Sequence, residues 1–434
     1  MRSAVLLLAI SGLLPTTLYA APKNIIYMIG DGMGPSYVAA YRYYQHDPAS
    51  ATVANTIYDD LLTGMASTYP DDDTLVTDSA AGATALATGI KSYNGAISVD
   101  RQHIPIGTLM QLAKRLGKAN GIVASSQVNH ATPASFLAHN KSRRNLNDIA
   151  DMYLDYRING RPVADVIIGG GTKYFVREDR DLVAGFTELG YQYTSDYKQL
   201  DSLTRLPAIA LLADTALPAV LNTEFDSMLG PLTAKALQLL SEAEKGFVLM
   251  VEGSQIDWCG HDNDIACAMA EMHDFAQAIQ VAKAYVDANP DTLLIITADH
   301  ETGGLSLGAN GVYQWRTDII KKVNASGREI SRQLQQLTNQ QDISKRYTEL
   351  TGLSLDKAQL QLLVSALKDE DDKVGRDQIL QFISDASLTG WTSGGHTAVD
   401  VPVMAYGKHA NEFNGFMDNT DIAKKIIQFI QQTK

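Results

Sequence analysis

Six short apolar runs constrain the fold of this chain more than any other feature of its sequence. They are rich in β-forming residues. Each run is followed by polar or glycine-rich sequence and then by a helical pattern. The runs span residues 24–29, 121–124, 165–168, 247–251, 293–297 and 401–405. Because their hydrophobicity is continuous rather than alternating, we expect strands that are buried on both faces. The sequence therefore predicts an α/β fold with three layers, in which helices cover both faces of a doubly wound and mostly parallel sheet.

Helices are expected beside these strands, and one polar region stands apart from them. The candidate helices span residues 35–44, 108–116, 232–244 and 265–288, and the last carries apolar residues at helical spacing. Residues 313–388 are mainly polar and helix-forming, and they contain no glycine-rich site motif. We interpret this region as a helical insertion that folds over or beside the predicted site.

Polar side chains directly follow three of the apolar runs. Asp31 comes after the first run, Glu252 after the run 247–251, and Asp299 with His300 after the run 293–297. In open α/β sheets, ligands bind outside the carboxyl ends of the strands. We therefore expect one cleft to collect all four side chains.

The length, the leader and the charge limit the setting in which the protein acts. The 434 residues suit one large domain with an insertion, or two ordinary domains. Arg2, the apolar run 4–14 and Ala20 predict a signal peptide over residues 1–20, which would send the mature chain to the periplasm or the external medium. No later run is long enough for a membrane helix. The formal net charge of −13 argues against nucleic acid as a stable partner, although metal ions in a cleft would still attract a phosphate.

The two cysteines, Cys259 and Cys267, leave two possibilities open. They would form a disulfide if they faced each other across a loop-to-helix junction. On a single straight helix they would lie too far apart.

Three segments combine residues that suit zinc or magnesium. Asp299 and His300 suit zinc if the chain turns after the strand, and the alternative is an ordinary capped helix N-terminus. Asp257 and His261, four residues apart, suit one ion, with His396 from a glycine turn as a third ligand. Glu252 suits a harder magnesium site. The alternative for residues 252–261 is a polar loop that caps the next helix.

Further candidates lie in four other segments. Asp31, in the turn GDGMGP, suits a metal better than a dinucleotide, because the third glycine of that fingerprint is missing. Ser79 stands at the start of a small-residue helix, where it would either meet an anion or simply cap the helix. Thr132 would offer a hydroxyl to magnesium, and Arg143 or its neighbour Arg144 would hold two phosphate oxygens, unless both arginines are solvated.

Together, six motifs resemble the alkaline phosphatase family in content and order: GDGMG, TDSAAGATALATG, HATPA, VEGSQIDWCGH, TADHETGG and SGGHT. The resemblance implies one catalytic domain over residues 21–434 that hydrolyses small phosphomonoesters and forms a homodimer. It implies two zinc ions and one magnesium ion per chain. One zinc would take Asp257, His261 and His396, and the other Asp31, Asp299 and His300. Magnesium would take Asp31, Thr132 and Glu252.

The resemblance also implies the roles of the remaining residues. Ser79 would be the nucleophile that becomes a phosphoserine, and Arg143, by its distance after Thr132, would be the phosphate clamp. His130 would lie near the magnesium in place of the aspartate of some family members, and Trp258 would follow the ligand Asp257. The charge of the three ions exceeds that of the four carboxylates by two, which matches a phosphomonoester dianion.

Other functions compete with this interpretation. A phosphodiesterase on the same scaffold would share the metal residues but would need a different segment around the nucleophile. A sulfatase is disfavoured, because Ser79 lacks the Pro and Arg spacing of its modified-residue motif. A non-catalytic, exported protein that binds zinc or phosphate could have the same ligands. Three ligands per zinc argue against this last alternative, since structural zinc sites usually have four.

Overall fold

The computed structural model describes residues 20–432. The signal peptide predicted for residues 1–20 lies, apart from Ala20, outside the described residues. Within the part that is described, no helix combines the length and the apolar character that crossing a membrane requires.

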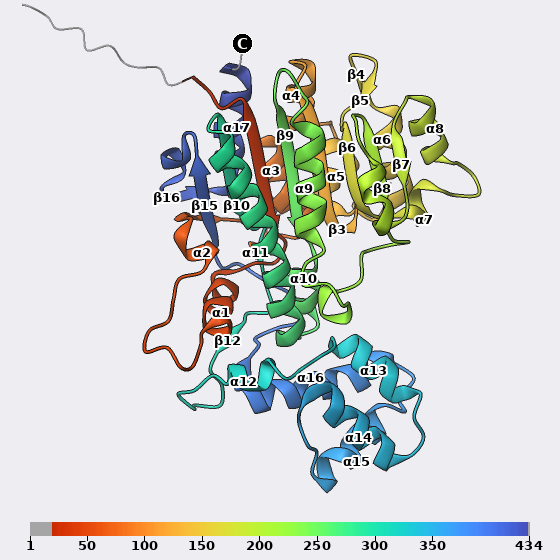
Figure 1. Cartoon of the computed structure of the whole chain (residues 1–434), viewed down its shortest axis with the longest axis vertical. Coiled ribbons are helices and arrows are strands. Elements are labelled where there is room, and N and C mark those ends of the chain that lie inside the picture. The colour runs from red at the N-terminus through yellow and green to blue at the C-terminus, as the bar shows by residue number, and fades with distance from the viewer. Residues whose placement is uncertain (1–19, 433–434) are drawn as a thin grey trace, which may run out of the picture.

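One large sheet forms the centre of the molecule (Figure 1). Among the described residues its ten strands follow the order β16-β2-β15-β10-β1-β9-β3-β6-β8-β7. The central strands are β1 (Asn24–Gly30), β3 (Ala119–Gln127), β6 (Val166–Gly170), β9 (Phe247–Gly253) and β10 (Thr292–Thr297). These five strands pair with one another in parallel. Every residue in these five strands is buried, which explains their continuous hydrophobicity. The predicted α/β class with a mostly parallel sheet is confirmed.

Four strands of the sheet were not predicted, and one predicted strand runs the other way. The strands missed are β2 (Leu62–Ser67), β7 (Gln192–Thr194), β8 (Ala208–Leu211) and β16 (Gly415–Asp418). They are short, and β2 and β16 are partly exposed, so their apolar signal is weak. β15 (Val401–Gly407) pairs antiparallel with both β10 and β2. Its buried, continuous apolar run does not reveal its direction, because a central antiparallel strand is covered on both faces as well.

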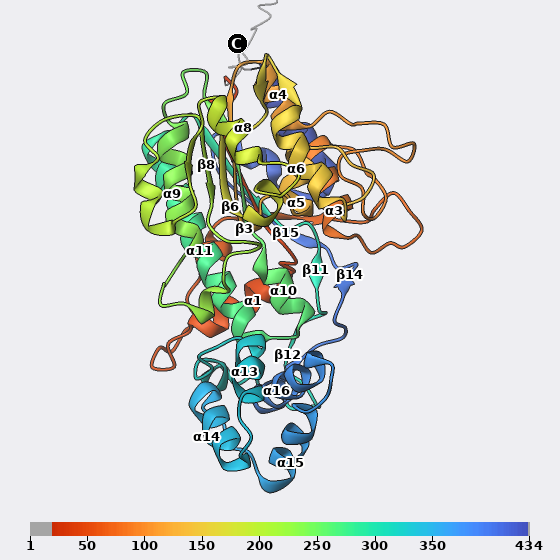
Figure 2. The same cartoon turned by 90° about the vertical axis from the view of Figure 1, so that its right-hand side faces the viewer.

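Helices cover both faces of the sheet, and the two views agree on their arrangement (Figures 1 and 2). On one face lie α9 (Leu229–Leu240) and α11 (Ile265–Ala288). On the other lie α3 (Ser79–Thr88), α4 (Leu109–Arg115), α5 (Ala131–Leu137) and α17 (Asn419–Gln432). α1 (Pro35–Gln45) packs on α11. Three layers result, with the hydrophobic core on each side of the sheet.

The region predicted as an insertion forms a group of helices at one end of the molecule (Figure 2). They are α12 (Thr317–Ile320), α13 (Gly327–Gln335), α14 (Gln340–Thr351), α15 (Lys357–Ala366) and α16 (Asp372–Ser387). They lie beyond α10 (Gln255–His261), at the carboxyl end of the central strands.

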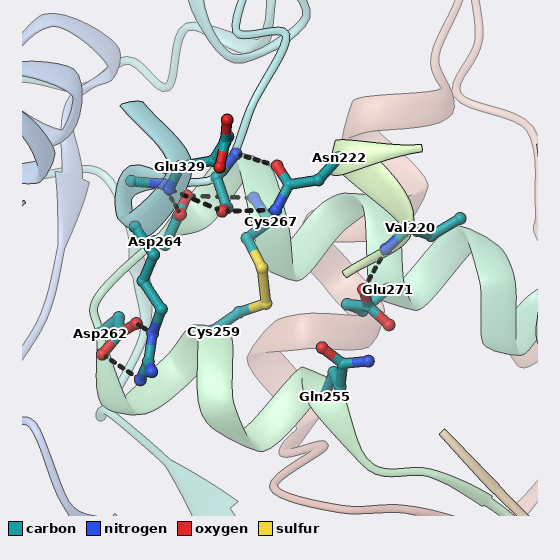
Figure 3. Close-up of a disulfide and its surroundings, with 12 residues drawn as sticks. Val220, Asn222, Gln255, Cys259, Asp262, Asp264, Cys267, Glu271 and Glu329 are labelled. Carbon is teal, nitrogen blue, oxygen red and sulfur yellow. Dashed lines mark hydrogen bonds and ion pairs between the residues drawn. A yellow bond between two sulfur atoms is a disulfide. The ribbon is translucent and has the colours of Figure 1, made fainter. Parts of the chain in front are cut away.

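Two residues at the start of α11 tie this helical group to the rest of the fold. Asp264 caps α11 by accepting from Cys267 N and also accepts from the backbone N–H of Gly327, at 2.7 Å. Asp262 pairs with the guanidinium of Arg328 on α13. The disulfide Cys259–Cys267 joins α10 to α11 in the same place, with a Cα–Cα distance of 5.5 Å (Figure 3). Of the two possibilities left open by the sequence, the pairing across a junction holds, because a loop separates the two helices.

Two buried tyrosines of the core differ in one hydrogen bond, and this difference is testable. The hydroxyl of Tyr58 donates to the carbonyl of Met272 at 2.7 Å, whereas the hydroxyl of Tyr27 has no partner within residues 20–432. We expect Tyr58→Phe to lower the free energy of unfolding by about 1–2 kcal/mol, because Met272 loses its donor. Tyr27→Phe should leave it unchanged or raise it, because an unpaired buried hydroxyl is removed. Thermal unfolding of the two variants measures this; an equal loss in both would contradict the assignment.

Candidate metal centre

The strand register brings the predicted ligands to one level of the sheet. Ile29 of β1 pairs with Glu252 of β9 on one side and with Thr297 of β10 on the other. Asp31 and Asp299 each follow two residues later, so the three carboxylates leave neighbouring strands at the same edge. All three residues have an exposed fraction of 0%.

The first cluster comprises Asp257, His261 and His396, whose ligand atoms lie within 4.8 Å of one another. Asp257 and His261 project from consecutive turns of α10, and His261 Nε2 lies 3.3 Å from Asp257 Oδ2. His396 begins the short strand β14 (His396–Thr397), and its Nε2 lies 3.1 Å from His261 Nε2. These three residues, separated by up to 139 positions, converge on one point.

Backbone carbonyls fix both histidine rings of this cluster. His261 Nδ1 donates to the carbonyl of Gly394, and His396 Nδ1 donates to that of Thr77, each at 2.8 Å. With Nδ1 donating to a carbonyl, each Nε2 faces the cluster, and this is the nitrogen that would bind a metal in its deprotonated form.

The second cluster comprises Asp31, Asp299 and His300, all fully buried. His300 Nε2 lies 3.4 Å from Asp31 Oδ1 and 3.3 Å from Asp299 Oδ2. Ser79 points its hydroxyl at the same nitrogen, with Oγ at 3.1 Å from His300 Nε2. The predicted nucleophile therefore faces the second cluster directly.

The third cluster comprises Asp31, His130 and Glu252, and Asp31 is common to it and the second. The Oγ1 of Thr132 is buried and has no hydrogen-bond partner among residues 20–432. The hydroxyl of Ser126 donates to Oε2 of Glu252 at 3.3 Å, whereas Oε1 of Glu252 has no hydrogen-bond partner among the described residues. His130 stands edge to face against Trp258, with ring centroids 5.8 Å apart.

Arg143 lies beside Ser79, and Arg144 does not. Ser79 begins α3, and Asp78 caps that helix by accepting from Ala81 N. Arg143 Nη1 donates to the other carboxylate oxygen of Asp78 at 3.0 Å, and Arg143 Nη2 lies 3.2 Å from His130 Nε2. Arg144 is exposed to solvent. Only the first of the two arginines is held by residues of the site.

Thr302 is a residue of the site that the sequence analysis missed. Its hydroxyl donates to Asp257, and it lies 3.3 Å from His300 Nδ1, which can donate to it. Thr302 thus connects the first cluster to the second. The signal was available, since Thr302 belongs to the motif TADHETGG, but no spacing argument separates it from the other threonines.

Glycine is required where the chain turns between the clusters. Gly32 has a φ of +73°, and a Cβ at this position would lie 2.8 Å from the Cα of Asp257 and from Thr302 Oγ1. Its backbone N–H also donates to Asp299 at 3.2 Å. The first turn of the chain therefore packs against both clusters without a side chain.

Burial and mutual repulsion shift the carboxylates strongly. Burial raises the pKa of Asp31 well above its usual value, and the charges of Asp299, Asp257 and Glu252 add to that shift. Burial likewise raises the pKa of Asp299 to about 8 and that of Glu252 to about 7. The hydrogen bond with Asp257 raises the pKa of His261 to about 9. The chain alone does not supply enough positive charge to keep these carboxylates ionised.

The pKa values of two histidines of the site shift the other way. Burial lowers the pKa of His130 to about 3, with a further contribution from the charge of Arg143. Burial also lowers the pKa of His300 well below its usual value. Both imidazoles are therefore neutral, which is the form that binds metals.

The residues present fit bound cations. Six polar atoms of the site are buried and have no hydrogen-bond partner among the described residues. They are both carboxylate oxygens of Asp31, Oδ2 of Asp299, Oε1 of Glu252, Oγ1 of Thr132 and Nδ1 of His130. Burying a polar atom without a partner costs free energy, so a group of such atoms in one place indicates a site where cations bind. Nitrogen and carboxylate donors in the first two clusters suit zinc, and the oxygens of the third suit magnesium.

A cavity of about 860 Å³ in the described part of the chain lies elsewhere. It is bounded by α1 and the segment 307–317 and contains none of the predicted site residues. The chemistry is therefore located by its converging ligands and not by cavity size.

Known proteins resemble this chain over most of its length. A family model described as alkaline phosphatase matches residues 22–432. Alkaline phosphatase 3 of Bacillus subtilis (strain 168) is 43% identical over 411 residues, which cover 94% of this chain and 89% of that protein. The crystal structure of a cold-active alkaline phosphatase from the psychrophile Shewanella sp. is 48% identical, with a TM-score of 0.89, and covers 94% of this chain and 99% of that one.

A further solved structure contains a metal. It is a mutant of the alkaline phosphatase from the Antarctic bacterium TAB5, in which a histidine is replaced by glutamate and Mg is bound in the M3 site. It is 28% identical, with a TM-score of 0.71, and covers 95% of this chain and 99% of that one.

Removing cations should make stability depend steeply on pH. In the cation-free chain, Asp299, Glu252 and His261 have folded-state pKa values above their unfolded values, so the folded state binds more protons. Below about pH 6.5 the lowered pKa values of His130 and His300 oppose the effect of these groups, so the fall in stability should be steepest from about pH 6.5 to about pH 9. Bound cations would keep these groups deprotonated at every pH in this window, so loaded protein should show a shallower fall.

Thermal unfolding with chelator, or with added zinc and magnesium, measures the difference. Glu271, whose pKa burial raises to about 8, lies outside the three clusters and contributes equally to both forms. Parallel curves for the two forms would contradict cation binding at these clusters.

Proposed function

The chain belongs to the alkaline phosphatase family, and we propose that it hydrolyses phosphate monoesters to an alcohol and inorganic phosphate through a phosphoserine at Ser79. The observation that carries this proposal is the position of the Ser79 hydroxyl, at the N-terminus of the buried helix α3 and 3.1 Å from His300. A helix N-terminus stabilises an anion through its free N–H groups and its dipole. A phosphate attached to Ser79 would therefore be favoured there.

Two zinc ions and one magnesium ion per chain are part of the proposal. Asp257, His261 and His396 would hold one zinc, and Asp31, Asp299 and His300 the other. Asp31, Thr132 and Glu252 would hold magnesium, with His130 beside it. When bound, these ions would lower the pKa of the attacking hydroxyl and offset the charge on the oxygens around phosphorus. The related TAB5 mutant with Mg in its M3 site supports magnesium as a partner of this family.

The chain's own residues would perform the remaining steps. Arg143 would donate two parallel hydrogen bonds to phosphate oxygens, which orients the phosphorus towards Ser79. Ser79 would give up its hydroxyl proton, and its Oγ would form a bond to phosphorus while the bond from phosphorus to the alcohol oxygen breaks. The alcohol oxygen would leave with that electron pair and take up a proton, so that the free alcohol is released. Water would then cleave the phosphoserine, which releases phosphate and restores the hydroxyl.

The setting of the enzyme is also proposed. We infer that the mature chain acts in the periplasm or outside the cell, and the disulfide Cys259–Cys267 supports this because such bonds persist in oxidising compartments. We expect a homodimer from the family. Turnover separates this proposal from two alternatives. A phosphodiesterase would favour bis-p-nitrophenyl phosphate over p-nitrophenyl phosphate. A non-catalytic protein that binds zinc or phosphate would hydrolyse neither compound.

Replacing the nucleophile should stop turnover. We expect Ser79→Ala to reduce kcat for p-nitrophenyl phosphate by roughly 10³-fold or more, because no hydroxyl remains to take the phosphoryl group. Labelled phosphate trapped on the wild-type protein should map to the peptide that contains Ser79. Ser50→Ala, in an exposed loop, is the matched control and should keep both properties. Undiminished hydrolysis by Ser79→Ala would rule out the covalent route.

The two adjacent arginines provide a second matched pair. Arg143→Ala should reduce kcat/KM by roughly 10- to 100-fold, since one or two charge-assisted hydrogen bonds to the phosphate are lost. Arg144→Ala should change it by less than about 2-fold, because this side chain is exposed. Steady-state kinetics of both variants test the assignment, and a larger effect at Arg144 would reverse it.

A further inference from the structure

A polar cavity beside the metal centre has no role in the function proposed above. Its volume is about 440 Å³, which lies within the range of small-molecule sites. The catalytic part of the fold and the helical insertion both contribute to its wall: His261, Trp391 and Gly394 come from the first, and Asp377, Gln381 and Asp385 come from α16. Figures 1 and 2 show α16 beyond α10, at the end of the molecule formed by the insertion.

The direction of the proposed reaction leads into this cavity. Ser79 lies against His300 of the second cluster, so its attack approaches phosphorus from that side. In an in-line displacement the alcohol oxygen departs on the opposite side, towards Asp257, His261 and His396. The side chain of His261 is 37% exposed and lines the cavity. The rest of the alcohol would therefore extend from the metal centre into this space.

The charges on the wall are not balanced. Asp262 is neutralised by Arg328 and by Arg376, the latter at 3.3 Å, and Asp377 lies 3.9 Å from Lys373. Asp385 forms no ion pair with any of residues 20–432, and its carboxylate accepts a hydrogen bond from the Gln381 amide at 2.9 Å. Asp385 is thus the carboxylate of this wall whose charge is left uncompensated.

The indole of Trp391 contributes to the same wall. It packs against Gly303, where a Cβ would lie 2.7 Å from the ring.

We propose that this cavity is the subsite for the alcohol part of the substrate and that Asp385 selects phosphomonoesters whose alcohol bears a cationic amino group, as in an amino sugar phosphate. The proposal rests on the phosphomonoesterase function proposed above. Asp385 would pair with the ammonium group. Asp385 acts here as a specificity-determining residue and takes no part in the bond changes.

The test compares glucosamine 6-phosphate with glucose 6-phosphate at pH 7, where the amine carries its proton. The two esters differ in the amino group alone. We expect kcat/KM to favour the amino sugar by about 5-fold in the wild type, the size expected for a partly exposed charge pair. Asp385→Asn should bring the ratio close to one, and Asp385→Lys should reverse it. Glu370→Gln, an exposed residue outside the cavity wall, is the control and should keep the wild-type ratio.

A binding measurement separates recognition from turnover. Calorimetric titration of the Ser79→Ala protein with each ester should show the same preference, and the Ser79→Ala/Asp385→Asn double variant should lose it. An unchanged ratio in Asp385→Asn, with p-nitrophenyl phosphate hydrolysis present in the wild type, would overturn the subsite alone. Absence of p-nitrophenyl phosphate hydrolysis in the wild type would instead overturn the function on which the subsite rests.

Discussion

The repulsion among buried carboxylates at the ends of β1, β9 and β10 is the constraint on which the rest of the site depends. Asp31, Glu252 and Asp299 leave neighbouring strands at one level and are fully buried, and Asp257 faces them from α10. Burying charges of one sign is costly unless cations lie between them. The orphaned oxygens and raised pKa values are two consequences of the same arrangement. Cations would resolve both, and they would also give an acidic protein a local attraction for phosphate.

The backbone makes room for this arrangement and holds its ligands in place. Gly32 turns between the clusters where no side chain fits, and Thr302 links Asp257 to His300. His396 is oriented by the carbonyl of Thr77, two residues before the predicted nucleophile. A displacement of this segment would therefore affect a candidate metal ligand and Ser79 together, which ties the geometry of the candidate metal centre to that of the proposed chemistry.

The helical insertion is joined to the same centre. Asp262 and Asp264, which connect it to the start of α11, lie one and three residues after His261, and the disulfide encloses this short segment (Figure 3). The polar cavity between α16 and His261 is the place where, in the proposed function, this helical group would contact the substrate.

The sequence by itself determined the α/β class, the central strands, the family and the residues that gather at the site, because continuous apolar runs and six ordered motifs are local signals. It left open the choice between Arg143 and Arg144, except by resemblance, and the pairing of the cysteines. Only the tertiary structure decided which arginine lies beside Ser79, that β15 runs antiparallel, and that Thr302 connects two clusters. These facts depend on contacts between segments far apart in the chain, and no local spacing encodes the register that brings them together.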